Sequence, residues 1–246
     1  MSHLRAIARG ITLVALSLVV TFIGPGMAGA WDEPTLAKGY VSRNSAINGV
    51  ILFLHGCDGG SNTSPFVDWY DWFERSGFKV YAPNSFAEPR PPMSCSTPYP
   101  NKDEIYAVRV KQTVRVLDQL MQEYSHTRIY VWGHSEGGGV ANTLEQKVAG
   151  ILTTGYPCGF KRTPTTRIRP DVPVLVLMGS ERLDHYLLEA HLASGYATLH
   201  DLCADVFRSH PNASWKQFYT LGHGPYPGHL ELFRAVNEFL GIKTPW

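Results

Sequence analysis

The chain has 246 residues, of which 44% are hydrophobic and 12% aromatic. This length suits one domain with a sizeable core, and the apolar content is too high for an intrinsically disordered protein. Its 22 basic and 21 acidic side chains nearly cancel, so no strong uniform field favours a nucleic-acid or membrane-surface protein.

Residues 1–30 have the features of a cleaved export signal. Arg5 and Arg9 precede an uncharged apolar run over residues 11–23, and small residues at 28–30 suit a signal peptidase. The apolar run falls short of the roughly 20 residues that span a bilayer, which disfavours a transmembrane anchor. We expect a signal peptide over 1–30, one domain over 31–246, and a secreted or periplasmic mature protein without membrane contact.

From residue 45 onward, short β-rich runs alternate with longer helical patterns. The order is a strand over 50–54, a helix from 66 that stops at Gly77, a strand over 78–82, a helix from an Asn101 N-cap to Tyr124, a strand over 129–132, a helix over 140–148, strands over 148–152, 172–178 and 215–221, and a helix over 230–240. Strands separated by such helices pair in parallel through right-handed crossovers. The pattern predicts an α/β fold, a doubly wound and mostly parallel sheet with helices on both faces. The Pro- and Ser-rich stretch 85–100 is predicted to be a long surface loop.

One glycine-rich turn carries the clearest chemical signal. Residues 133–138 read Gly-His-Ser-Glu-Gly-Gly, directly after a predicted strand and before a predicted helix. A G-x-S-x-G sequence at such a junction is the nucleophile elbow, which lifts the serine hydroxyl out of the sheet edge. Ser135 is therefore the candidate nucleophile, and an inert serine in a glycine-rich turn is the alternative.

A serine nucleophile needs a base, and the base needs an acid that orients it. In this architecture both follow the nucleophile in the chain, the acid first. His223 lies in a loop after the last predicted strand and is the candidate base, with His229 as second choice. Asp184 and Glu181 both follow the strand over 172–178. Asp184 is preferred because the shorter carboxylate is the commoner partner.

The transition state of acyl transfer also needs amide donors for its oxyanion. The first strong strand ends in residues 55–60, His-Gly-Cys-Asp-Gly-Gly, whose loop should lie beside the nucleophile. The backbone N–H groups of Cys57 and Glu136 are the predicted oxyanion donors. A glycine-rich loop that serves only to reverse the chain is the alternative.

The four cysteines follow the predicted signal peptide. An even number in an oxidising compartment suggests disulfides. We favour Cys57–Cys95 and Cys158–Cys203, because each pair joins loops expected at the same end of the sheet. No two are spaced as C-x-x-C, so a zinc site is poorly supported. Four buried free thiols are the alternative.

These turns resemble the α/β-hydrolase superfamily and, within it, the dienelactone hydrolase family and its exported relatives. The likeness runs from residues 55–57 through 133–138 to His223, and residues 84–90 are also similar to a segment of that family. The resemblance implies hydrolysis of an ester or lactone through a covalent acyl-enzyme, without metal or organic cofactor. Residues 184–186, Asp-His-Tyr, are similar to the family's acid and the residues after it, which favours Asp184.

Two features depart from that family. The founding dienelactone hydrolases use a cysteine nucleophile where this chain has Ser135, so their particular substrate does not carry over. The acid also lies farther after Gly179 than is usual.

We therefore expect an exported serine hydrolase that acts on a small-molecule carboxylic ester or lactone and binds no nucleic acid. An acyltransferase with the same triad is one alternative. A non-catalytic binding protein on a hydrolase fold is the other, since fold alone does not imply function.

Overall fold

The structure is a computed structural model that describes residues 39–43, 45–59, 66–87, 102–159, 166–224 and 228–243. By its internal contacts the chain divides into Met1–Ala30 and Trp31–Trp246, and every described residue belongs to the second unit. The expected signal peptide therefore lies outside the described residues. Within the described ranges, no helix is both long enough and apolar enough to cross a membrane.

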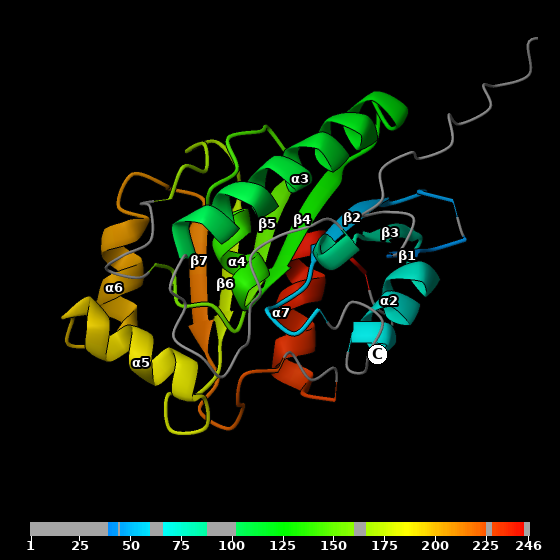
Figure 1. Ribbon diagram of the computed structural model, residues 1–246. Coiled ribbons are helices and arrows are strands. Elements are labelled where there is room, and N and C mark those ends of the chain that lie inside the picture. Colours follow the sequence, from blue (N-terminus) through cyan, green and yellow to red (C-terminus); the bar gives the residue numbers. More distant parts are fainter. Residues whose placement is uncertain are drawn as a thin grey trace, which may run out of the picture. The chain divides into compact units, whose positions relative to one another are not determined.

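The described strands form one seven-stranded sheet in the order β1-β3-β2-β4-β5-β6-β7 (Figure 1). Only β1 is antiparallel to its neighbour, and the other pairs are parallel. The sheet grows from β2 to β3 on one side and to β4 on the other, which makes the carboxyl ends of β2 and β4 the kind of switch point where open α/β sheets typically bind ligands. The strands are β1 (Tyr40–Val41), β2 (Gly49–Leu54), β3 (Phe78–Ala82), β4 (Ile129–His134), β5 (Gly150–Thr154), β6 (Val174–Met178) and β7 (Ala213–Gln217).

Helices cover both faces of this sheet (Figure 1). Buried side chains of α2 and α7 pack on one face, and those of α3, α4, α5 and α6 pack on the other. The prediction of an α/β fold with a mostly parallel sheet is confirmed. The helices are α2 (Phe66–Arg75), α3 (Lys102–Glu123), α4 (Glu136–Ala141), α5 (His185–Ser194), α6 (Leu199–Val206) and α7 (Leu230–Leu240), with a 3₁₀ turn, η1, at Ser85–Ala87.

The sheet is apolar on both faces because both are covered. All six residues of β2 are buried, and successive side chains enter opposite halves of the core. On the α2 side, Trp132 of β4 meets Phe53, Trp69 and Phe73 edge to face, with ring centroids 5.2–5.5 Å apart. The four buried aromatic residues of α2 thus form a helix face that packs on the sheet; they are Phe66, Trp69, Tyr70 and Phe73.

Some predicted elements are wrong in extent. The helix expected over 140–148 is instead α4, which begins at Glu136 and ends at Ala141. Residues 144–149 contain neither helix nor strand. The strand expected over 148–152 is β5, which begins at Gly150. The last strand spans Ala213–Gln217 rather than 215–221, because the apolar residues after Gln217 belong to the loop that leads to His223. The Asn101 cap and most of the loop over 85–100 lie outside the described residues.

The sequence interpretation missed β1, α5 and α6. The two residues of β1 are too few to show a strand period. Apolar residues are spread around α5 without a clear stripe, so the helix has no amphipathic signature. Its ends carry local signals instead: Asp184 caps the start, and Gly195 has a left-handed backbone at the end.

Candidate active site

Ser135 stands at the turn between β4 and α4, with φ 53° and ψ −120°. It is the only non-glycine residue with a positive φ among the residues described. Such a conformation costs free energy and persists only where the surroundings impose it. The Ser135 N–H donates to the Thr154 carbonyl oxygen of β5 at 2.8 Å, which ties the turn to the neighbouring strand.

Glycines make the turn possible because the backbone passes too close to its neighbours for a side chain. A Cβ atom added to Gly133 would lie 2.2 Å from the carbonyl oxygen of Gly137. A Cβ atom on Gly137 would lie 2.1 Å from the carbonyl oxygen of Leu54. The start of α4 is thereby pressed against the end of β2, next to the loop that begins at His55.

The structure brings Ser135, His223 and Asp184 together in one hydrogen-bonded chain. The Nε2 atom of His223 lies 2.8 Å from the Ser135 Oγ, and its Nδ1 atom lies 2.7 Å from the Asp184 Oδ2. Asp184 is 1% exposed and caps α5 with its other oxygen, Oδ1, which accepts from the N–H groups of Tyr186 and Leu187. The carboxylate is thus fixed by the helix start and can hold the imidazole in one orientation.

The loop that carries His223 reaches Ser135 because it crosses the strand ends at two glycines. A Cβ atom on Gly179, after β6, would lie 2.1 Å from the carbonyl oxygen of Gly222. A Cβ atom on Gly155, after β5, would lie 2.6 Å from the carbonyl oxygen of His223. Gly155 also has φ +58°, a conformation that favours glycine.

Two aromatic rings flank the His223 imidazole. The Tyr186 centroid lies 4.9 Å from it, and the His134 centroid lies 5.1 Å from it. Burial raises the pKa of the Tyr186 phenol, and the negative charge of Asp184 acts in the same direction. Burial also holds the pKa of His134 well below its usual value, and the neighbouring His223 adds to this effect. His134 is therefore a neutral ring beside the candidate base.

The segment with the predicted oxyanion donor Cys57 lies directly against the candidate nucleophile. A Cβ atom on Gly56 would lie 3.2 Å from the Ser135 Cβ. Cys57 is buried, and Glu136 is the first residue of α4. The amides of both residues thus belong to segments that adjoin Ser135.

The second-choice residues lie elsewhere. Glu181 pairs with His191, with 3.1 Å between its Oε1 and the histidine Nδ1. His229 caps α7, and its Nε2 lies 3.1 Å from the Thr220 hydroxyl. Neither residue belongs to the hydrogen-bonded series of Asp184, His223 and Ser135.

The predicted disulfide between Cys158 and Cys203 is present and joins the loop after β5 to α6. Cys57 is also disulfide-bonded. Its expected partner, Cys95, lies outside the described residues. In the described part of the chain, no three His, Cys, Asp or Glu side chains gather as metal ligands.

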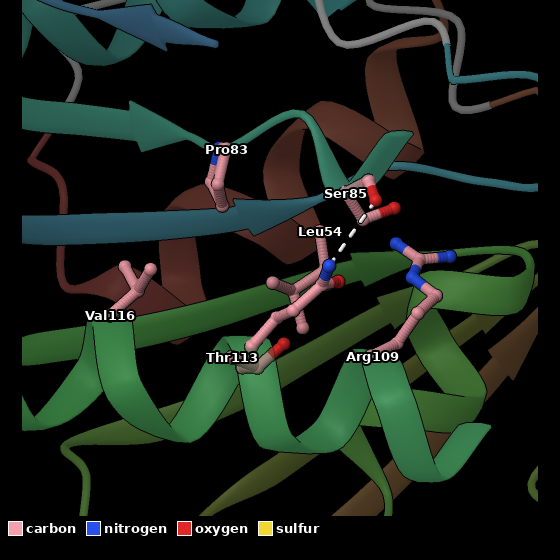
Figure 2. Close-up of a pocket in the computed structure, with 7 residues that line it drawn as sticks. Leu54, Pro83, Ser85, Arg109, Thr113 and Val116 are labelled. Carbon is pink, nitrogen blue, oxygen red and sulfur yellow. Dashed lines mark hydrogen bonds between the residues drawn. The ribbon is translucent and has the colours of Figure 1, made fainter. Parts of the chain in front are cut away.

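A buried polar network that sequence analysis did not single out lies behind the candidate oxyanion loop. Its members are His55, Ser85 of η1 and Arg109 of α3, all at most 7% exposed. Ser85 and Arg109 line a small cavity next to the end of β2 (Figure 2). The network therefore adjoins the loop that begins at His55.

Comparisons with known proteins identify the fold. No protein-family model and no curated protein matches the chain. Among solved structures, TT1662 from Thermus thermophilus is 18% identical, with a TM-score of 0.58, and the match covers 85% of this chain and 97% of that one. An alpha-beta serine hydrolase homologue from Coxiella burnetii is 15% identical, with a TM-score of 0.52 and coverages of 82% and 88%. A dienelactone hydrolase from Anabaena variabilis is also 15% identical, with a TM-score of 0.53 and the same coverages.

At such identities the likeness concerns the fold alone, and the fold is the α/β-hydrolase fold. The structural neighbours include a serine hydrolase homologue and a dienelactone hydrolase, which supports a hydrolase fold for this chain. The function depends on the chemistry of the site and does not follow from the fold.

Proposed function

We propose that this chain is an exported serine hydrolase that cleaves a carboxylic ester or lactone through an acyl-enzyme intermediate. The observation that carries the proposal is the pair of hydrogen bonds from Ser135 to His223 and from His223 to Asp184, at 2.8 and 2.7 Å. A serine hydroxyl becomes nucleophilic when a base within hydrogen-bond reach takes its proton, and an acid on the far ring nitrogen fixes that base.

In the acylation half-reaction, the Ser135 Oγ attacks the carbonyl carbon of the substrate while its proton moves to the His223 Nε2. The negative charge of Asp184 stabilises the imidazolium that forms. The N–H groups of Cys57 and Glu136 are proposed to donate to the oxyanion. When the tetrahedral intermediate collapses, the ester bond breaks and the leaving alkoxide takes the proton from His223.

In the deacylation half-reaction, His223 takes a proton from water, and the hydroxyl oxygen attacks the acyl carbon. Collapse of the second intermediate breaks its bond to the Ser135 Oγ, which recovers its proton from His223. The products are a carboxylic acid and an alcohol from an ester, or one hydroxy acid from a lactone. Ser135 is the nucleophile of acylation and water that of deacylation, and His223 moves the proton in both half-reactions.

Export is part of the proposal. Residues 1–30 carry the charge and apolar pattern of a signal peptide. The Cys158–Cys203 disulfide is compatible with an oxidising compartment, where such bonds persist. Amino-terminal sequencing of protein recovered outside the cytoplasm tests this, since cleavage after Ala30 should leave Trp31 as the first residue.

The catalytic proposal is tested with a fluorophosphonate probe and p-nitrophenyl esters of graded acyl length, with lactones alongside. The wild-type chain should be labelled at Ser135 and should turn over at least one ester. Ser135→Ala should keep its circular dichroism spectrum and lose both reactions. An unlabelled wild type would indicate a binding protein, and ester products in place of the free acid, with an alcohol acceptor present, would indicate an acyltransferase.

A further inference from the structure

A buried ion pair joins the two segments that adjoin Ser135. The Nη1 atom of Arg109 lies 2.5 Å from the Glu136 Oε1, and Nη2 donates to the His55 carbonyl oxygen at 2.7 Å. Arg109 is 2% exposed and Glu136 is 6% exposed. One guanidinium therefore holds both the start of α4 and the first residue of the loop after β2. Figure 2 shows this side chain extending from α3 beside Ser85.

The same network fixes the peptide that carries the Cys57 N–H. The Ser85 N–H donates to the His55 Nε2 at 3.0 Å, so the ring proton resides on Nδ1. That proton is donated to the Gly56 carbonyl oxygen at 2.7 Å. Because C=O and N–H point in opposite directions across a trans peptide, holding the Gly56 oxygen also sets the direction of the Cys57 N–H.

The location of the Arg109–Glu136 ion pair indicates a role other than stabilising the fold. Taking two charges out of water is costly, and well-packed apolar residues of similar volume often give equal or greater stability than a buried ion pair. A planar guanidinium can, however, hold two acceptors at a fixed separation. Here its acceptors are the Glu136 side chain and the His55 carbonyl, on the two segments that carry the proposed oxyanion donors.

We propose that Arg109 is a positioning residue that holds the Cys57 and Glu136 amides at the spacing the oxyanion requires. The inference rests on the proposed function and adds to it how the oxyanion site is kept in shape. It acts through the protein backbone, so Arg109 need not touch the substrate. Its loss should weaken binding of the transition state more than binding of the ester.

The proposal is tested with Arg109→Lys and Arg109→Met, assayed on p-nitrophenyl acetate. Turnover is expressed per site titrated to completion with fluorophosphonate, so that unfolded protein is not counted. Removing one oxyanion donor typically costs about 100- to 1,000-fold in kcat. Because the amides here are displaced rather than removed, we expect kcat to fall about 10- to 100-fold in both Arg109 variants, with KM within about threefold. Lys111→Met, which removes an exposed cation of the same helix, is the matched control and should leave both constants unchanged.

A transition-state analogue separates positioning from simple support of the fold. An aliphatic trifluoromethyl ketone forms a tetrahedral adduct with serine, and its affinity should fall by about the same factor as kcat. The double variant Arg109→Met/Glu136→Leu removes both charges at once, so that neither is left buried without its partner. It should unfold near the wild-type temperature and still have low kcat.

Two results would overturn the inference while leaving the proposed function intact. One is an active wild type whose Arg109 variants keep full kcat per titrated site. The other is a double variant that recovers kcat together with its unfolding temperature. A wild type that neither hydrolyses esters nor reacts at Ser135 would remove the proposed function, and the inference would fall with it.

Discussion

The Nε2 atom of His223 lies 2.8 Å from the Oγ of Ser135, although 88 residues separate the two in the chain. Parallel strands make this possible because the carboxyl ends of β4, β5 and β6 lie at one edge of the sheet. Ser135 follows β4, and the His223 loop crosses the ends of β5 and β6 at Gly155 and Gly179. The pairing thus depends on glycines far from either residue in sequence.

Asp184→Asn should lower kcat about 10,000-fold, as the equivalent change does in other triads, while leaving the fold intact. In the wild type, Oδ1 accepts from two amides of α5 and Oδ2 faces the His223 Nδ1. If the asparagine oxygen keeps the helix cap, its NH₂ group faces the ring and donates to Nδ1. The imidazole proton then resides on Nε2, and the protonated Nε2 atom cannot accept the Ser135 proton. Steady-state kinetics and the unfolding temperature test both halves of this prediction.

Glu181→Gln is the matched control, because Glu181 is the other carboxylate after β6 and pairs with His191 instead. Its kcat should stay within about twofold of the wild type, because its carboxylate faces His191 and not the His223 imidazole. A large loss in Glu181→Gln with near-normal Asp184→Asn would reverse the assignment of the acid.

Gly137→Ala should lower both stability and activity. The new methyl group would lie 2.1 Å from the Leu54 carbonyl oxygen and 2.7 Å from that of His55, both backbone atoms that move only with β2. Overpacking of this kind typically costs about 1–3 kcal/mol, and the shift would also displace the loop that leads to Cys57. Urea unfolding and ester turnover measure the two effects. Among the residues that the structure describes, no atom lies within 4 Å of a carbon added at Gly228, so Gly228→Ala should be neutral. Equal behaviour of the two variants would contradict this explanation.

The sequence predicts most of this fold because its strongest signals are local. The strands around Val50 and Val174 are continuous apolar runs, and the elbow at Ser135 is a short motif with its strand before and its helix after. Sequence left the acid open between Asp184 and Glu181, because both follow the same strand. Only three-dimensional placement separates them, through the cap of α5 and the bond to His223.

The apolar pattern of the sequence does not indicate that Arg109 is buried. In the sequence of α3, the apolar residues that recur at helical spacing leave Arg109 outside their stripe; they are Val110, Val114, Leu117, Met121 and Tyr124. The face that is buried in fact includes Ile105, Arg109 and Val116, so a charged side chain lies in the covered face. A residue whose partners are 27 and 54 positions away gives no local signal of them.

Replacing Cys158 and Cys203 together by alanine should lower the free energy of unfolding by about 3–4 kcal/mol. The bond closes a loop with a sequence separation of 45 and therefore restricts the unfolded chain considerably. The measurement is urea unfolding without reductant. With dithiothreitol present, the difference between wild type and variant should largely disappear, because the wild type loses the same bond. Identical unfolding curves without reductant would show that the bond contributes nothing to stability.

His134 should make stability depend on pH below its ordinary pKa of 6.5. Burial holds its folded-state pKa well below that value, so in the window between the two the unfolded chain binds a proton that the folded chain does not. The free energy of unfolding therefore decreases as the pH falls from 6.5, by up to about 1.4 kcal/mol per pH unit. The decrease stops once the pH is below the folded-state pKa of His134.

The test compares urea unfolding at pH 7.5 and 5.5 for the wild type, His134→Gln and His126→Gln. The glutamine at 134 does not titrate, so that variant should lose less stability between the two pH values than the wild type loses. His126 is exposed, and its replacement should leave the wild-type pH dependence in place. If His134→Gln and the wild type lose equal stability on acidification, then the imidazole beside His223 is not the group that opposes folding in acid, and its protonation is tolerated in the folded state.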